Sequence, residues 1–244
     1  MRYGILGDVH ANPSALDSVL AALARDGVDR YVSVGDLVGY GADPGACVER
    51  VAELGAVVVA GNHDLAALDR MDLNYFNPYA REAILWTRTA LGSGHREFLS
   101  SLPLVREDGP ITVVHGSLDR PELFDYIQTA VDARSSLEKM KTRVCFVGHS
   151  HVPVSFLRKD EEPERLWYTF DPEVSLRGYS RALVNVGSIG QPRDGDARAA
   201  YAVYDVEADK VSIRRVEYDF EREAERIVRA GLPRALGERL RLGL

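Results

Sequence analysis

Aspartate, histidine and asparagine side chains recur at the ends of apolar runs along this chain. Five short motifs contain them: Asp8-Val9-His10, Gly35-Asp36, Gly61-Asn62-His63-Asp64, His115-Gly116 and Gly148-His149-Ser150-His151. Each motif directly follows one of the largely apolar runs at 3–6, 31–34, 56–60, 111–114 and 144–147. Such runs predict strands buried on both faces, and α/β sheets bind ligands beyond the carboxyl ends of their strands. These side chains suit divalent metals of intermediate softness, so the pattern predicts a metal site.

Each motif taken alone has a simple structural explanation. Asp8 and His10 could form a turn with a surface histidine, Asn62 could cap a helix, and His115 could be a hydrogen-bonded core residue. The combination favours chemistry, because five of only six histidines stand at strand ends. The sixth, His95, lies elsewhere and is expected on the surface.

The elements between the motifs indicate an α/β fold in one domain, 1–244. A helix is predicted from Pro13, with Asn12 as its N-cap, to Gly27, and another over 44–54. Residues 65–105 are predicted to form a helical excursion beside the site. Further strands are predicted at 152–157, 166–170, 182–186, 200–206 and 210–217.

Two charged segments are predicted to be solvated. Residues 158–165 are expected to form the loop of a hairpin. Residues 219–244 form a helical tail in which Arg222, Arg226 and Arg229 share one face. A solvated helix is the favoured interpretation of that face, and a contact in a homodimer is the alternative.

Bulk composition limits the function classes. The 244 residues are 45% hydrophobic and 27% charged, with a formal net charge of −7. No general basic field therefore exists to attract nucleic acid or anionic lipid. A phosphate-bearing substrate would need a local positive centre, which bound metal ions would supply.

The same composition bears on the compartment. Cys47 and Cys145 stand in apolar surroundings, which favours buried free thiols and a reducing environment. The chain shows no signal peptide and no stretch long enough to span a bilayer. We therefore expect a cytoplasmic protein.

The ordered series of five motifs resembles the calcineurin-like metallophosphoesterase superfamily over residues 1–151. The later segment Asn185-Val186-Gly187-Ser188 with Gln191-Pro192-Arg193 is similar to the tail of the small prokaryotic members. The resemblance implies two mixed β-sheets packed as a sandwich and flanked by helices, in four α/β/β/α layers. It also implies a site with two divalent metal ions at one edge.

The resemblance further implies a ligand set. One ion would be held by Asp8, His10, Asp36 and His151, and the other by Asp36, Asn62, His115 and His149. Asp36 would bridge them, because a carboxylate can offer one oxygen to each ion. Ions roughly 3.5–4 Å apart clamp a phosphate and hold a hydroxide that attacks in line. The ligands suit manganese, iron, cobalt or zinc, with manganese expected to work in vitro.

Two residues beside the ligands have implied catalytic roles. His63 would face the leaving oxygen, where it would protonate it or stabilise its charge. Asp64 would orient the His63 ring. Asn62 and His63 would both contact the substrate.

One departure from the family pattern narrows the subclass. Phosphoprotein phosphatases and symmetrical diadenosine tetraphosphate hydrolases carry Asp-Arg-Gly at the bridging aspartate, whereas Asp36 is followed by Leu-Val-Gly. Arg193 is a candidate for the missing phosphate contact, with a salt bridge to Asp194 or Asp196 as the equal alternative. Tyr40 either lines the pocket or packs on the surface.

These features predict a dinuclear phosphoesterase acting on a phosphodiester or phosphoanhydride of a small molecule, such as a nucleotide. One alternative is a phosphomonoesterase, including a phosphoprotein phosphatase. A second is a non-catalytic metal-binding interaction protein on the same fold, which is disfavoured because His63 and every ligand position are filled. The negative charge and the lack of a basic-aromatic stripe disfavour long nucleic acid.

Overall fold

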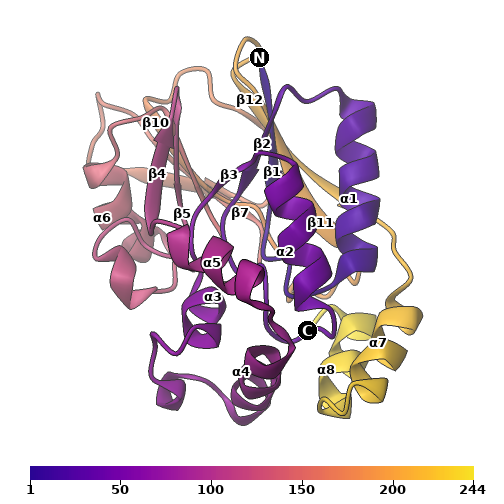
Figure 1. Cartoon of the computed structure of the whole chain (residues 1–244). Helices are drawn as coiled ribbons and strands as arrows, with labels where there is room; N and C mark the ends of the chain where they lie inside the picture. Colours follow the sequence, from indigo (N-terminus) through magenta and orange to yellow (C-terminus); the bar gives the residue numbers. More distant parts are fainter.

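Two mixed six-stranded sheets form the centre of the protein in a computed structural model that describes residues 1–244 (Figure 1). The first sheet contains, in spatial order, β3 (Val57–Val58), β2 (Arg30–Ser33), β1 (Arg2–Leu6), β11 (Ala199–Asp205), β12 (Lys210–Val216) and β9 (Glu173–Ser175). The second contains β4 (Val105–Asp108), β5 (Ile111–Val114), β6 (Val144–Val147), β10 (Arg181–Asn185), β7 (Val154–Arg158) and β8 (Leu166–Thr169). In each sheet three parallel strands are joined to antiparallel neighbours.

Helices cover the outer faces of both sheets and gather at one end of the sandwich. They are α1 (Pro13–Asp26), α2 (Pro44–Glu53), α3 (Asn62–Ala67), α4 (Pro78–Ala90), α5 (Ser93–Ser101), α6 (Ala130–Lys139), α7 (Phe220–Arg229) and α8 (Arg234–Leu242), with short 3-10 helices η1 (Leu73–Tyr75) and η2 (Pro121–Leu123). In Figure 1, α1 and α2 flank one side and α6 the other, while α3, α4, α7 and α8 lie at the lower end. The predicted sandwich of four layers is confirmed.

The core between the two sheets is built by alternation along the strands. Tyr3 and Ile5 of β1 face the second sheet, where they join Phe146 of β6 and Val184 of β10. Leu6 points to the opposite face and packs with the helices outside the first sheet. Full burial of each such side chain contributes about 1.5–3 kcal/mol, which fixes the strands whose ends form the site.

Polar caps fix where the helices begin. The side chains of Asn12, Asp43 and Asn77 accept the backbone N–H of the third residue along in α1, α2 and α4. A proline follows each cap, where its missing N–H costs nothing. The helix α1 stops at Gly27 in a left-handed conformation, as the sequence predicts.

Some strands differ from the predicted ones. The sequence gives no signal for β4 or β9, because β4 is a charged edge strand without apolar alternation and β9 is only three residues long. The strand predicted from residue 152 begins at Val154. Residues 158–165 do connect two antiparallel strands, β7 and β8, so the predicted hairpin is confirmed.

The predicted solvated face of the C-terminal helix is confirmed at Arg222 and Arg229, which are exposed, but other residues of the tail pack against the protein. The helices α7 and α8 bury Ile227, Leu236 and Leu240 in a cluster that also contains Tyr40 and residues of α4. Arg226, one of the three arginines on the shared face, bonds to Asp43 at 2.6 Å. The sequence hid this packing, because the α7 face has few apolar residues and its partner surface is distant in the chain.

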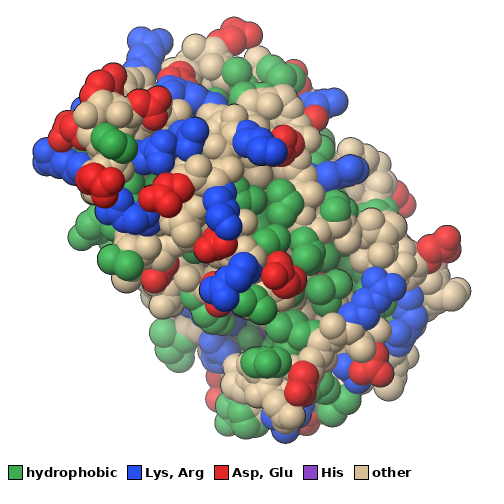
Figure 2. Space-filling model, turned by 90° about the vertical axis from the view of Figure 1, so that its left-hand side faces the viewer, with side chains coloured by type: hydrophobic (Ala, Val, Ile, Leu, Met, Phe, Trp, Pro, Cys, Tyr) green, Lys and Arg blue, Asp and Glu red, His purple; other side chains and the backbone are tan.

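Other surface and core features follow the expectations. The thiols of Cys47 and Cys145 are buried and free, and burial raises the pKa of Cys145 to about 12. Basic and acidic side chains are interspersed on the α6 side (Figure 2), so no field of one sign covers that face. None of the helices has the length and apolar character needed to cross a bilayer.

Candidate metal centre

The five motifs converge at the end of the sandwich where the parallel strands finish. Asp8 follows β1 and pairs with Ser188, Asp36 follows β2, and Asn62 begins α3 just after β3. From the second sheet, His115 follows β5, and His149 and His151 follow β6. Parallel strands end at a common edge, so side chains distant in sequence meet there.

Strained backbone is concentrated at this edge. His10, Asp36, Tyr40, His149 and His151 all have positive φ angles between 49° and 68°. Such conformations cost roughly 1–3 kcal/mol each for a residue other than glycine. Backbone hydrogen bonds help to hold them, since the carbonyl of Asp36 accepts the N–H of His10 at 2.9 Å. The surrounding fold therefore directs these side chains toward the cluster, and the strained backbone conformations cost free energy.

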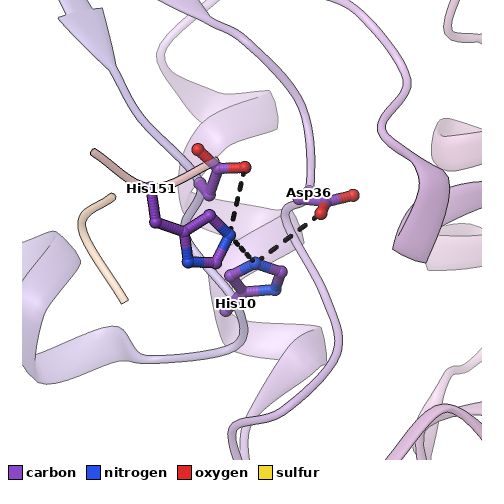
Figure 3. Close-up of side chains that lie close together, drawn as sticks. His10, Asp36 and His151 are labelled. Atoms are coloured by element: carbon purple, nitrogen blue, oxygen red, sulfur yellow. Dashed lines mark hydrogen bonds and ion pairs between the residues drawn. The ribbon is translucent and has the colours of Figure 1, made fainter. Parts of the chain in front are cut away.

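The first group of side chains comprises Asp8, His10, Asp36 and His151, all fully buried. Figure 3 shows His10 between His151 and Asp36. The Nε2 atom of His10 lies 3.0 Å from Nε2 of His151 and 3.6 Å from Oδ2 of Asp36. The Nε2 atom of His151 lies 3.5 Å from Oδ1 of Asp8.

The hydrogen bonds behind this first group show that it fits a cation. The Nδ1 atoms of His10 and His151 lie 3.0 and 2.6 Å from the carbonyl oxygens of Val38 and Gln191. A carbonyl only accepts, so both Nδ1 atoms carry the hydrogen and both Nε2 lone pairs face each other. Facing lone pairs repel unless a cation lies between them. Asp8 Oδ2 is also buried without a partner.

The second group comprises Asp36, Asn62, His115 and His149. The Nε2 atom of His115 lies 3.0 Å from Oδ1 of Asn62, 3.2 Å from Nδ1 of His149 and 3.3 Å from Oδ2 of Asp36. The Nδ1 atom of His115 donates to the carbonyl of Val34 at 2.9 Å. This backbone bond fixes the ring and its tautomer, as outer hydrogen bonds do for metal-binding histidines.

Asp36 lies between the two groups, and one of its carboxylate oxygens faces both of them. Its Oδ2 atom faces both His10 and His115, whereas Oδ1 accepts the backbone N–H of His63 at 2.8 Å. The arrangement with one carboxylate oxygen for each ion stays a prediction, since the distances from Oδ2 join Asp36 only to histidine nitrogens. A carboxylate oxygen has lone pairs enough to face two cations, so the two groups form one continuous cluster.

The burial of the cluster controls its protonation. Burial lowers the pKa values of His10, His149 and His151 well below the usual histidine range. Burial also opposes a charge on His115, but the adjacent Asp36 carboxylate outweighs it and raises the pKa of His115 to about 9. Burial raises the pKa of Asp8 to about 6. Divalent metals bind neutral imidazoles and carboxylates, so His10, His149 and His151 are already in the ligand form, whereas a metal would displace a proton from His115.

His63 stands next to the cluster, with its ring packed among other rings. Its ring centroid lies 4.9 Å from His10, 4.5 Å from Tyr40 and 5.1 Å from Phe76. Its Nδ1 atom is buried against Gly39, where a Cβ atom would come within 2.3 Å of it. Burial lowers the pKa of His63 to about 4, so the imidazole is neutral near pH 7 and Nε2 remains to face the pocket.

The predicted role of Asp64 in orienting the His63 ring is wrong. Its carboxylate accepts the backbone N–H groups of Leu37, Val38 and Gly61 at 2.9, 3.2 and 3.0 Å. Adjacent helical residues point in directions about 100° apart, so Asp64 turns away from the ring. Asp64 instead ties the turn after β2 to the start of α3, which sets the separation of Asp36 from Asn62.

Arg193 extends toward the cluster and has no carboxylate partner. Its guanidinium donates to Oη of Tyr40 at 3.2 Å and to Oε1 of Gln191 at 3.0 Å. Asp194 pairs with Arg215 instead, and Asp196 with the neighbouring Arg198. The salt bridge considered for Arg193 is thus absent, and its charge lies at the site.

A pocket of about 260 Å³ opens over the cluster. Its floor contains Asp36, Asn62, His63, His149, His151 and Arg193. Tyr40 lines it as well and is buried, which settles the alternatives left by the sequence. His95 takes no part in the site, since it bonds to Glu49 between α5 and α2.

The predicted helical excursion at 65–105 does lie beside the site and supplies part of the outer wall of this pocket, but the sequence does not predict the residues of the wall or the contribution of the segment at 123–126. The members of the wall are Met71, Tyr75, Phe76, Asn77, Ala80, Leu123, Phe124, Asp125 and Tyr126. The available signal was the clustering of aromatic residues in two irregular segments, at 75–76 and 124–126. The sequence predicts a helical tail but not that α8 lies near the site, where burial and the charge of Arg193 lower the pKa of Arg239.

Comparison with known proteins gives consistent matches along the chain. Residues 1–209 match the calcineurin-like phosphoesterase superfamily domain. The crystal structure of a metallophosphoesterase from Sphaerobacter thermophilus is 40% identical, with a TM-score of 0.87 and full coverage of both chains. The uncharacterized protein MJ0912 of Methanocaldococcus jannaschii is 38% identical over 98% of this chain and 97% of its own. The hypothetical protein PH1004 of Pyrococcus horikoshii shares the fold at 21% identity, with a TM-score of 0.80 over 100% and 98% of the chains.

Proposed function

The chain belongs to the calcineurin-like phosphoesterase superfamily, and from this premise we propose that it hydrolyses a phosphodiester or phosphoanhydride of a small molecule. The observation that carries the proposal is the buried cluster in which Asp36 Oδ2 faces both His10 and His115. Its donors are imidazole nitrogens, carboxylates and an amide oxygen, a set that suits two divalent ions of the first transition series. Manganese is the ion we propose for assays.

We propose that each of the two groups of side chains holds one metal ion. Asp8, His10, Asp36 and His151 would hold one ion, and Asp36, Asn62, His115 and His149 the other. When bound, the ions neutralise the phosphate charge and make a water nucleophilic at neutral pH. The protein contributes rigid ligands, because the backbone carbonyls behind the rings of His10, His115 and His151 fix their orientation.

Two further side chains are proposed to act on the substrate. Arg193 has unused donors beside the cluster, so it would hold a phosphate oxygen in place of the arginine that follows the bridging aspartate in related phosphatases. His63 lines the pocket and, as a neutral ring, would hydrogen-bond to the leaving oxygen through an N–H group. A bound phosphate anion would raise the pKa of His63 and so populate the protonated ring, which can transfer a proton to the leaving oxygen and return to the neutral form.

We propose a preference for a diester over a monoester because the Arg193 guanidinium is already partly engaged in hydrogen bonds. This guanidinium already bonds to Tyr40 and Gln191, so it has fewer free donors for the extra charge of a monoester dianion. The ions and one partly engaged arginine match a singly charged phosphodiester better.

A direct test compares bis-p-nitrophenyl phosphate with p-nitrophenyl phosphate on manganese-loaded protein, followed by cyclic nucleotides and dinucleotides. We expect a higher kcat/KM for the diester. We also expect Arg193→Ala to raise KM about tenfold or more, in line with loss of a charge-assisted hydrogen bond. Arg198→Ala, which removes a surface arginine paired with Asp196, is the matched control and should leave KM unchanged.

Two outcomes would overturn this assignment. A faster reaction on the monoester would make the protein a phosphomonoesterase. Absence of turnover on every phosphate ester by fully metal-loaded protein would favour a metal-binding interaction protein.

A further inference from the structure

The outer wall of the pocket presents aromatic surface that the proposed hydrolysis does not require. Two segments form this wall, one running from η1 into α4 and the other following η2. Tyr75 in the first segment is 81% exposed, and Tyr126 in the second is 49% exposed. Both rings line the same pocket as the metal cluster.

Tyr126 connects this wall to the cluster. Its ring lies parallel to that of His149, with the centroids 3.9 Å apart and the planes at 18°. One face of Tyr126 therefore covers a proposed ligand, and its exposure shows that part of the ring remains open. A group attached to a phosphate at the cluster would lie within reach of Tyr126.

Tyr75 has no comparable packing role in the fold. Its side chain is largely solvent-exposed, so truncating it removes little core. An aromatic ring held at the mouth of a pocket retains its hydrophobic surface and its π face for a ligand. Planar rings are the partners that such a surface binds most favourably, by stacking.

Polar groups beside the tyrosines favour a nucleobase over a plain aryl ring. Asn77 uses its Oδ1 atom to cap α4, which leaves its NH₂ group as a donor at the rim. Asp125 lines the same rim; its Oδ2 atom pairs with exposed Arg120 at 3.5 Å, which leaves Oδ1 as an acceptor. A base edge carries donors and acceptors that match these groups, whereas a phenyl ring carries none.

We propose that Tyr75 and Tyr126 form a stacking site for the nucleobase of a nucleotide substrate whose phosphate binds at the metal cluster. This inference rests on the proposed phosphoesterase function and adds the substrate class. Tyr75 would act as a specificity residue that touches the base. Tyr126 would both contact the base and cover His149.

Calorimetric titration of manganese-loaded protein tests this inference with inorganic phosphate, ribose 5-phosphate, phenyl phosphate and adenosine 5′-monophosphate. Released phosphate is measured in parallel, so that turnover does not distort the binding constants. Stacking predicts that the adenine raises affinity over ribose 5-phosphate by roughly fivefold to a hundredfold. Phenyl phosphate should gain less, because it cannot bond to Asn77 or Asp125.

Variants of exposed residues then locate the effect. Tyr75→Ala should bring the affinity for adenosine 5′-monophosphate close to that for ribose 5-phosphate and leave inorganic phosphate unchanged. Tyr75→Phe should retain the gain, because it retains the ring. Tyr79→Ala is the matched control, since Tyr79 is 49% exposed on α4 but does not line the pocket.

Equal wild-type affinities for ribose 5-phosphate and adenosine 5′-monophosphate would overturn the stacking site and leave the phosphoesterase proposal intact. Equal effects of Tyr75→Ala and Tyr79→Ala would overturn the stacking site in the same way. A tighter complex with phenyl phosphate than with the nucleotide would replace the nucleobase by an aryl group. Failure of inorganic phosphate to bind would overturn the phosphate site itself and this inference with it.

Discussion

The two halves of the metal cluster differ in how far the protein encloses them. We call Asp8, His10 and His151 the inner half, and Asn62, His115 and His149 the outer half. In the inner half both rings are fixed by backbone carbonyls and no residue is more than 1% exposed, although His151 reaches the pocket. In the outer half His115 is equally buried, but Asn62 and His149 are each 7% exposed and both line the pocket.

This contrast indicates a division of work. The inner half resembles a rigid site that is formed before any ligand arrives, whereas the outer half is more open to the pocket in which we propose that the substrate binds. His149 shows the difference most clearly, because its ring is steadied by the side chains of Tyr126 and His115 rather than by a carbonyl. We therefore expect the inner half to retain its ion more tightly than the outer half.

The largest expected effect comes from Asp36→Asn, since this carboxylate belongs to both halves. Loss of a hydrogen-bond partner behind a metal ligand typically costs 10- to 100-fold. Removing the charge shared by the two halves should cost more than about a hundredfold in kcat/KM. The loss in kcat/KM of Asp36→Asn should also exceed the loss caused by replacing any ligand that belongs to one half alone. Steady-state kinetics would refute the shared role of Asp36 if the Asn variant kept wild-type activity.

His10→Ala and His149→Ala test the contrast between the halves directly. The His149 variant should retain about one ion per chain, whereas the His10 variant should retain less manganese after dialysis. The reason is that His149 disturbs only the exposed half, while His10 disturbs the half expected to bind more tightly. Mass spectrometry of metal content on folded variants provides the measurement. Equal retention by the two variants would remove the distinction between inner and outer halves.

His63→Ala should show whether this residue protonates the leaving group. General acid catalysis contributes typically about a hundredfold to ten-thousandfold, and an alkoxide needs the proton far more than a nitrophenolate does. The variant should therefore lose much more activity on a nucleotide ester than on a nitrophenyl ester, with its metal content unchanged. Equal losses on both esters would assign His63 to positioning of the phosphate, and loss of metal would make it a ligand.

The smallest effect on chemistry is expected from Leu236→Ala in α8. Leu236 is buried in the cluster that contains Tyr40, so truncation should lower the free energy of unfolding by about 2–5 kcal/mol. Because no ligand is removed, kcat should change much less than in His63→Ala. Leu242→Ala, at an exposed position in the same helix, is the control for denaturant unfolding. Similar stabilities for the two variants would show that α8 does not support the site.

Local signals in the sequence predict an α/β fold with polar side chains gathered at the strand ends, whereas the two-sheet sandwich and the division of ligands between two ions come from the family resemblance. Apolar runs followed by Asp8, Asp36 or His115 mark strand ends, and strand ends of parallel strands meet in space. Asn12 and Gly27 bound the first helix by cap chemistry. These signals can be recognised in the sequence without knowledge of tertiary contacts.

The remaining features depend on contacts between distant segments. The neighbours of Asp64 are set by how the turn after β2 packs on α3, and the sequence shows only that Asp64 adjoins His63. The orientation of the Asp36 carboxylate is set partly by the backbone N–H of His63, which no side-chain pattern reveals. The burial of α8 and the aromatic wall at Tyr75 and Tyr126 likewise arise from the packing of loops and helices at one end of the sandwich.

The central claim is that two ions in the shared cluster make the protein a phosphoesterase. The most direct test removes all metal by exhaustive chelation and then adds manganese in measured equivalents, while hydrolysis of bis-p-nitrophenyl phosphate is followed. We expect no turnover by the metal-free protein and a rise in activity that reaches its plateau at two ions per chain. Undiminished turnover by protein verified to be metal-free, or a plateau at one ion, would contradict this account.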